Sequence, residues 1–270
     1  MAITTLDGLI AANKVVRPLH RTAGLTTVAG GWFTNFHVAG ANPGVLAGGE
    51  TTPPANTAGR VPTDTIPGYP DLPWSTLRSY LSRVGVANTV ASQLRIFDRL
   101  WVGGTYAFNA AVAVTASSYA SRVSYNGGAA DYKGLEIWAE AVTESTGNQA
   151  YNVTYTDQDG NAGATTGATG IGSVTSIGRC WQLPLAAGDS GVQTITNVAG
   201  SVASAGTANI MVLRPIVDLY LPTNNLAVMN WADLALPELF NDSALYCLFM
   251  SPSGTALGTV APFNLQFANG

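Results

Sequence analysis

From Leu94 onward the sequence contains short runs in which two kinds of side chain alternate from one residue to the next, and turn residues separate these runs. Side chains of similar type recur every second residue in 94–101, 135–140 and 151–156. This is the spacing of residues on one face of a β-strand. Repeated short strands with regular turns predict a mainly β fold, a β-sandwich or a jelly-roll-like domain, rather than strands alternating with long helices.

Further segments have the composition of strands. Pro215 lies inside one of them and predicts an edge strand or a bulge there, because proline has no backbone N–H to give to a ladder. We expect 135–140 and 151–156 to pair with each other as a hairpin. The further predicted strands are Ser176–Leu183, Gly191–Val198, Ala208–Tyr220, Ser243–Met250 and Ala261–Phe267.

The first 92 residues differ from the rest, and we predict an arm with short helices over 1–92 ahead of a β-sandwich domain over 93–270. Seven of the fourteen prolines fall in 43–73, which favours an extended, irregular chain there. Aromatic residues among the prolines indicate an ordered arm, with a disordered linker as the alternative. The aromatic side chains expected to contact a partner are Trp32, Phe33, Phe36, Tyr69, Trp74 and, in the sandwich domain, Trp138.

Two short helices are predicted within the arm. Thr5 or Asp7 is suited to cap a short helix that runs through Leu9, Ile10 and Lys14 and ends near Val16–Pro18. Pro73 at a first helical position favours a second helix over 74–84, because apolar side chains recur there at the spacing of one helix face.

Charged residues are scarce and unevenly distributed. The chain has 12 Lys and Arg and 16 Asp and Glu among 270 residues, less than half the usual share of about 25%. Between residues 160 and 213 only Arg179 and Asp189 are charged, and 243–270 has no charge. Soluble proteins usually carry interspersed surface charge. We therefore expect these two segments, which have few or no charges, to form core and subunit contacts in an assembly.

The overall charge and the cysteine content exclude several classes of protein. A net charge of −4 gives no basic footprint for nucleic acid. No apolar run approaches the roughly 18 residues of a membrane span, and the N-terminus lacks the pattern of a signal peptide, so we expect a chain made in the cytoplasm. Cys180 and Cys247 are too few for a disulfide framework and are expected as buried thiols.

The most specific candidate for a catalytic motif is Gly188–Gly191, with the sequence Gly-Asp-Ser-Gly. It matches the first four residues of the serine-nucleophile motif of chymotrypsin-like proteases, in which a histidine activates the serine. However, Val192 replaces the final glycine, and His37 lacks the Ala-Ala-His-Cys context of that family. The sequence favours a tight turn, and a serine hydrolase using Ser190 is the remote alternative.

Two patterns of acidic residues resemble parts of binding or catalytic sites. Asp157–Asn161 begins like a calcium loop, but its glycine is fourth rather than sixth, and Ala168 occupies the twelfth position where glutamate belongs. A hairpin turn is therefore expected there. His20 and His37 have no ligand cluster around them, so we predict no metal, no cofactor and no small-molecule substrate.

Glu136 and Glu140 lie on one face of a predicted strand, about 13 Å apart. That separation exceeds the roughly 5 to 9.5 Å of glycosidase carboxyl pairs. We expect these glutamates, with Asp157 and Asp159, to form an acidic face toward water. Trp138 lies between the two glutamates, and a glycan-binding module using Trp138 or Trp181 remains an alternative.

The region Gly134–Pro215 contains four segments whose order and composition are informative. They are Leu135–Trp138, Asn152–Asp157, Leu183–Val192 and Val212–Pro215. In their order and composition, over about a third of the chain, they resemble structural proteins of tailed bacteriophage virions. Those are β-proteins rich in Gly, Ala and Thr and poor in charge, similar to head decoration, or cement, proteins.

The resemblance implies a mechanical function without catalysis. Such subunits, as homo-oligomers such as trimers, would bridge copies of the major capsid protein on the virion surface and hold the shell against internal pressure. Tail, neck or baseplate proteins share the same composition and form the alternative within this class.

Overall fold

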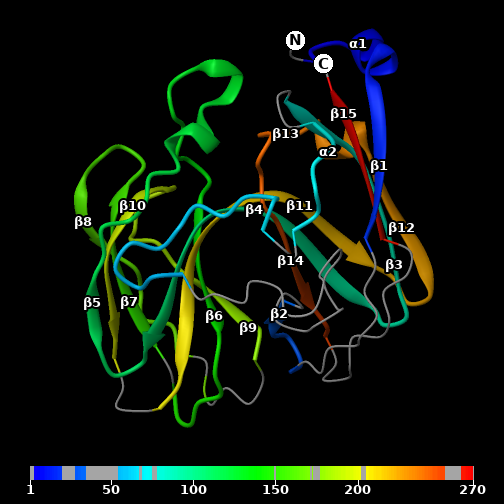
Figure 1. The fold of residues 1–270 in the computed structure, drawn as a ribbon. Helices are drawn as coiled ribbons and strands as arrows, with labels where there is room; N and C mark the ends of the chain where they lie inside the picture. Colours follow the sequence, from blue (N-terminus) through cyan, green and yellow to red (C-terminus); the bar gives the residue numbers. More distant parts are fainter. Residues whose placement is uncertain are drawn as a thin grey trace. The chain divides into compact units, whose positions relative to one another are not determined.

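The described part of the chain is built mainly from antiparallel β-strands, as the mainly β prediction requires (Figure 1). The structure, a computed structural model, describes residues 3–19, 28–34, 54–66, 69–74, 78–148, 150–170, 172, 177–201, 205–252 and 263–269. None of the helices formed by these residues has the length and apolar character needed to cross a bilayer.

The chain divides into two units, each made from more than one segment. Unit 1 comprises Met1–Glu50, Thr63–Asp98 and Ile216–Gly270, and unit 2 comprises Thr51–Pro62 and Arg99–Pro215. The division differs from the predicted boundary between residues 92 and 93, because strands from both ends of the chain combine in unit 1.

Unit 1 contains a sheet in which segments from opposite ends of the chain are neighbours. The strand order is β1, β15, β3, β12, and every pair is antiparallel. A short strand, β13, pairs with the start of β3. The strands are β1 (Asn13–Leu19), β15 (Phe263–Asn269), β3 (Ser79–Asn88), β12 (Asn225–Asn230) and β13 (Glu238–Leu239).

Unit 1 also contains two short helices and a second group of strands. β14 pairs with β2 and with the first half of β4, antiparallel in both cases. Apolar side chains from these strands and from the sheet form a single buried cluster, the core of unit 1. The elements are α1 (Leu6–Ala11), α2 (Trp231–Leu234), β2 (Trp32–Phe33), β14 (Leu245–Met250) and β4 (Ser92–Ala107), which continues into unit 2.

Unit 2 contains one sheet in the order β5, β10, β7, β8 and a second group in which β6 pairs with β9 and β11. Side chains from both groups share one buried core, which includes Ile137, Val153 and Ile195. The strands are β5 (Ala111–Ala113), β6 (Glu136–Ala141), β7 (Tyr151–Asp157), β8 (Ala162–Thr165), β9 (Arg179–Leu183), β10 (Val192–Gly200) and β11 (Thr207–Leu221). Two 3₁₀ turns are η1 (Ala120–Val123) and η2 (Tyr125–Gly127).

The strands predicted from Leu94 onward are confirmed as β4, β6, β7, β9, β10, β11, β14 and β15. The predicted hairpin between 135–140 and 151–156 is wrong. β6 pairs with β9 and β11, whereas β7 pairs with β8 and β10. Both strands present alternate apolar side chains to the same core from different sheets, so their similar patterns do not make them neighbours.

The helix predicted over 74–84 is also wrong, because residues 79–88 form β3. The bulge at Ser82 explains the error. Leu81 pairs with Phe267 and Arg83 with Gln266, which leaves Ser82 as an extra residue. A bulge interrupts the alternation of sides, so Leu81 and Val84 both reach the core at a spacing of three that resembles a helix.

The first predicted helix is confirmed in a shorter form. The hydroxyl oxygen of Thr5 accepts a hydrogen bond from the backbone N–H of Gly8 at 3.0 Å and caps α1. The helix ends at Ala11. Residues from Asn13 onward belong instead to β1, where they pair with β15.

The proline-rich segment is only partly described. Arg60 exchanges two backbone hydrogen bonds with Val102, and the Trp101 indole N–H donates to the carbonyl of Ala58 at 3.1 Å. Residues 54–62 are therefore attached to unit 2 of their own chain. Most of the predicted arm before Pro54 lies outside the described residues.

Candidate interaction surface

The sheet of unit 1 has one face in the core and one face toward solvent. Val84 and Leu265 point into the core, while their neighbours Arg83 and Val16 lie on the opposite face and are exposed. We call this second side the outer face; it is made by alternate residues of β1, β15, β3 and β12.

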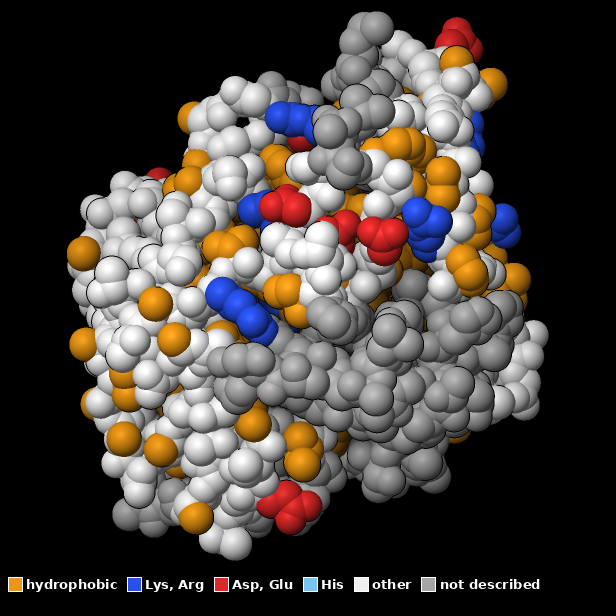
Figure 2. Space-filling view, in the orientation of Figure 1, with side chains coloured by type: hydrophobic (Ala, Val, Ile, Leu, Met, Phe, Trp, Pro, Cys, Tyr) orange, Lys and Arg blue, Asp and Glu red, His pale blue; other side chains and the backbone are white. Residues whose placement is uncertain are grey.

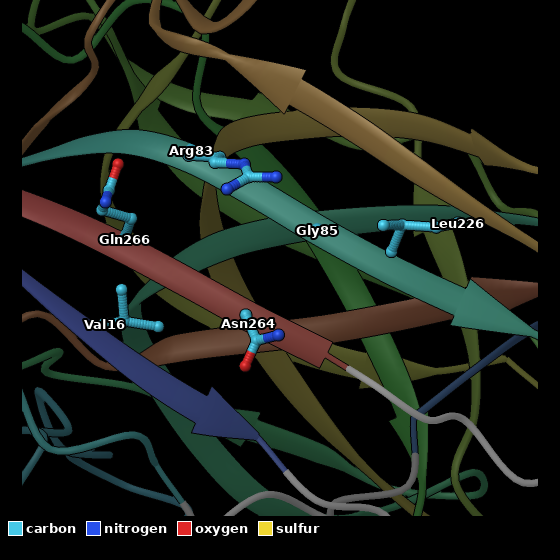
Figure 3. Close-up of a pocket in the computed structure, with 6 residues that line it drawn as sticks. All are labelled: Val16, Arg83, Gly85, Leu226, Asn264 and Gln266. Atoms are coloured by element: carbon cyan, nitrogen blue, oxygen red, sulfur yellow. The ribbon is translucent and has the colours of Figure 1, made fainter.

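A hollow of about 200 Å³ lies in the outer face. Gly85 is one of the residues that line it and is itself buried, and the absence of a side chain there leaves the space beside the backbone of β3 unfilled. A Cβ placed on Gly85 would meet a single neighbouring atom within 4 Å, Cδ1 of Leu226 at 4.0 Å. Figure 3 shows the lining residues on four neighbouring strands. They are Val16, Arg83, Gly85, Leu226, Asn264 and Gln266.

The polar groups of the hollow are only partly used within the chain. The Ser82 hydroxyl bonds both the backbone carbonyl oxygen and the side-chain Oε1 of Gln266, at 3.0 and 3.3 Å. Arg83 is exposed and forms no ion pair with any described residue. A guanidinium has five donors suited to a carboxylate, so the hollow combines apolar walls with an available cation.

Large apolar side chains surround the hollow and extend beyond it. Leu226 and Val228 on β12 are 53% and 41% exposed, and Val16 on β1 is 51% exposed. Of the nine large apolar side chains that are exposed within the described ranges, eight belong to unit 1. Clustered apolar exposure of this kind is typical of surfaces that bind another macromolecule.

Helix α2 follows directly after β12 and is fixed by a capping box. The Asn230 side chain accepts from the N–H of Ala232 at 2.9 Å, and Asp233 accepts from the N–H of Asn230 at 3.0 Å. Trp231, the first helical residue, remains 42% exposed. The exposed apolar character of β12 therefore continues into α2.

The aromatic residues expected at an interface are mostly buried in their own unit. Phe33 and Tyr69 are almost fully buried in unit 1, and Trp138 is 1% exposed in unit 2. Trp32 and Trp74 are partly buried, and Phe36 lies outside the described residues. Burying a large aromatic side chain contributes strongly to stability because it removes a large apolar area from water. The buried aromatic side chains therefore stabilise their own unit and are not exposed to contact a partner.

The two glutamates of β6 do not form a solvated acidic pair. Glu140 has no exposed side-chain surface; it forms an ion pair with Arg99 at 3.3 Å and accepts from the amide of Asn209 at 2.9 Å. Glu136 accepts from the Trp138 indole N–H at 2.7 Å. Because Trp138 and Trp181 are buried, neither presents a ring face to a sugar.

The Gly-Asp-Ser-Gly segment forms a turn held by its own neighbours. The backbone N–H groups of Ser190 and Gly191 both donate to Oε1 of Gln158, at 2.9 and 3.1 Å. Asp189 accepts from the hydroxyl of Tyr155 at 2.6 Å, and burial raises the pKa of that phenol to about 12. The Ser190 amide, one of the two that would bind an oxyanion in such a protease, is therefore occupied, and His37 lies outside the described residues.

The Asp157 segment is the hairpin turn between β7 and β8. Asp157 accepts from the backbone N–H groups of Asp159 and Asn161 at 2.8 and 2.9 Å, and from the Asn161 amide at 2.8 Å. The Asn161 side chain is the main reason that the pKa of Asp157 is lowered. Within the described ranges no cluster of acidic, histidine or cysteine side chains could hold a metal ion, and His20 lies outside those ranges.

Both cysteines are free and buried, as expected. Burial raises the pKa of the Cys247 thiol to about 12, so at neutral pH it is protonated and unreactive. Cys180 belongs to unit 2 and Cys247 to unit 1.

Sequence reasoning missed the residues of the outer face. β12 is apolar on both sides, since Ala227 and Met229 pack against the core while Leu226 and Val228 face water. Such a strand gives no alternation of apolar and polar residues. The absence of any charge in 225–230 is the one signal that could have indicated a covered strand.

No protein-family model and no curated protein matches the chain. Among solved structures, the chain has a weak similarity to the crystal structure of the infectious bursal disease virus VP2 subviral particle. The two are 12% identical, with 96% of this chain and 80% of that chain covered. The TM-score is 0.18, so this similarity carries no argument about fold or function.

Proposed function

We propose that the chain is a non-enzymatic structural subunit of a virion, a decoration or cement protein whose outer face docks on the major capsid protein. In this proposal unit 2 is a β-sandwich that provides a rigid body, and unit 1 provides the contact. The observation that carries the proposal is the outer face of unit 1, with its exposed apolar residues and its hollow at Gly85.

Two features of the surface support this proposal. Charged side chains are sparse among neutral and apolar ones on the face shown in Figure 2, which is unfavourable for a free protein and suits one that is covered. Arg83 has no ion pair among the described residues. The capsid surface that fits the hollow is therefore apolar, with one carboxylate to meet that guanidinium.

The alternatives receive less support from the structure. The glycan-binding alternative relied on Trp138 and Trp181, which are buried. The hydrolase alternative relied on Ser190, which lies in a turn whose amides and aspartate are already bonded. A position in the tail, neck or baseplate requires the same surface and differs from the proposal only in the partner.

Binding to particles that lack the protein tests the proposal. Purified chain added to such particles should sediment with them and raise the temperature at which they release their genome. Gly85→Gln, which fills the hollow with a neutral side chain, should weaken binding at least about tenfold. Asn152→Gln, at an exposed position on β7 of unit 2, is the matched control and should bind like the parent chain.

The outcomes separate the alternatives. Failure of the parent chain to bind heads would overturn the decoration proposal, and binding to isolated tails would assign the same surface to a tail position. Equal binding of both variants and the parent would show that the outer face is not the contact.

A further inference from the structure

The two edges of the unit 1 sheet differ in their protection against pairing. β1 forms one edge and contains Lys14, Arg17 and Pro18. Charged residues and proline are the usual means by which proteins prevent an edge strand from pairing with another chain. β12 forms the other edge, and its sequence Asn-Leu-Ala-Val-Met-Asn has neither charge nor proline.

Within the described part of the chain, the backbone of β12 is paired with another strand on one side only. Among the described strands β12 has one neighbour, β3, with which it pairs over Asn225–Asn230. In Figure 1 the strand lies at the margin of this sheet, next to β3. An antiparallel strand in this position turns alternate backbone N–H and C=O groups away from its neighbour, and these can accept a further strand.

We propose that two copies of the chain pair through the free edges of their β12 strands, antiparallel about a two-fold axis, so that their unit 1 sheets join. A second copy is the occupant that the charges favour. Two β12 strands meet without any like-charge cost, whereas two β1 strands would bring two copies of Lys14 and two copies of Arg17 to one edge. The inference adds a contact between copies to the proposed function and depends on that function only for its biological role.

The alternation of faces fixes the register. Residues that oppose each other across two strands lie on the same face of a sheet, so outer residues must oppose outer residues. An axis through Ala227 places Leu226 opposite Val228 of the partner subunit, twice by symmetry. This register joins both exposed apolar residues of one copy to those of the other, whereas an axis through Val228 would place Leu226 opposite an asparagine.

The length of the edge sets the expected strength. Six residues of strand span about 20 Å, and such a contact alone is smaller than a standard protein interface. We therefore expect a dissociation constant between about 1 µM and 1 mM. Pairing would be weak in dilute solution and would become complete where many copies are concentrated on one surface.

Two lysine variants of the full chain test the edge. Val228→Lys replaces the apolar contact with Leu226 of the partner subunit and places two like charges on the same face of the paired edge, about 8 Å apart. Sedimentation velocity should show dimerisation weakened at least tenfold. Val16→Lys makes the same chemical change on the same face but on β1, and its dissociation constant should stay within about twofold of the parent. Circular dichroism and thermal melting should show that both variants fold.

Cysteine cross-linking tests the register, since the two native cysteines are buried. In the proposed register residue 226 of one copy opposes residue 228 of the other, within the roughly 7 Å that a disulfide spans. A mixture of Leu226→Cys and Val228→Cys proteins should therefore form covalent dimers on mild oxidation. Each variant alone should not, because identical positions lie about 8 Å apart.

A parent chain that is monomeric at 1 mM, or a Val16→Lys variant weakened as much as Val228→Lys, would overturn the inference. Dimers without the mixed cross-link would overturn the register. Particle binding is measured separately through Gly85→Gln, so loss of either result leaves the other standing.

Discussion

Unit 1 exposes Leu226, Val228 and Trp231 to water, whereas unit 2 exposes one large apolar side chain within its described residues, Ile177. Both units have buried apolar cores, and both are poor in charge. The segment 160–213, expected to form core and subunit contacts because its only charges are Arg179 and Asp189, lies in unit 2. Apart from Ile177, its exposed described positions carry mainly small neutral residues. A segment poor in charge therefore does not by itself indicate where an interface lies. Exposed apolar side chains are the feature that indicates a candidate surface.

Unit 2 contains buried polar groups whose partners belong to the same unit. One is the Arg99–Glu140 ion pair, with no exposed side-chain surface on either partner. Two of its tyrosines donate to backbone carbonyls, Tyr106 to Asn56 and Tyr119 to Val192, both at 2.7 Å. Unit 1 differs from unit 2 in the number of large apolar side chains that it exposes.

Breaking the buried ion pair should give the largest difference between the units. Arg99→Met leaves a carboxylate buried without its cation, which costs about 3 to 5 kcal/mol. Because Cys180 reports on unit 2 and Cys247 on unit 1, the rate of thiol labelling measures the opening of each unit. Labelling of Cys180 should accelerate at least about 100-fold, and labelling of Cys247 should not change.

Arg83→Met is the control for this prediction, since the exposed Arg83 has no ion pair within the described part of the chain. It should change the free energy of unfolding by less than about 0.5 kcal/mol. Equal acceleration at both cysteines in Arg99→Met would show that the two units open together, and the energetic contrast between them would fail.

The Asp157 turn should make part of the stability of unit 2 depend on pH. Hydrogen bonds lower the folded-state pKa of this carboxyl, so its contribution is present above the unfolded-state pKa of about 4 and is lost as pH falls through the folded-state pKa. Asp157→Ala should lower the midpoint of urea unfolding at pH 7, and the difference from the parent should shrink below pH 4. A difference that does not vary with pH would contradict the assignment.

The smallest energetic effect is expected on the outer face. Leu226→Ser should change the free energy of unfolding by less than about 0.5 kcal/mol, because the side chain is already half exposed. It should nevertheless shorten retention on a hydrophobic-interaction column. Ile177→Ser removes a comparably exposed side chain from unit 2 and should shorten retention less, unless the apolar surface of unit 1 is not continuous.

The sequence predicted elements whose signals are local. The Thr5 cap marks a helix start, and strict alternation marks β6 and β7. Contacts between distant residues could not be predicted in this way. The partner of Glu140 is Arg99, 41 positions away, and nothing in either local pattern indicates that the two meet.

The candidate surface was harder to predict than the strands. Phe33 and Trp138 are of residue types that are common at interfaces, but the same large apolar area also favours burial in the core, where both lie. Gly85 creates the hollow by lacking a side chain, and a glycine within a strand has several explanations in a sequence. The extra residue at Ser82 concealed β3 by giving it the spacing of a helix.

The pairing of β1 with β15 has a consequence for the order in which the protein forms during synthesis. β1 leaves the ribosome before the other described strands, and its neighbour in the sheet, β15, is made after them. The strands of unit 2 lie between them in sequence, so unit 2 can fold before β15 has been made. The sheet that contains β12 is completed only then, which delays the proposed contact between nascent copies until β15 has left the ribosome.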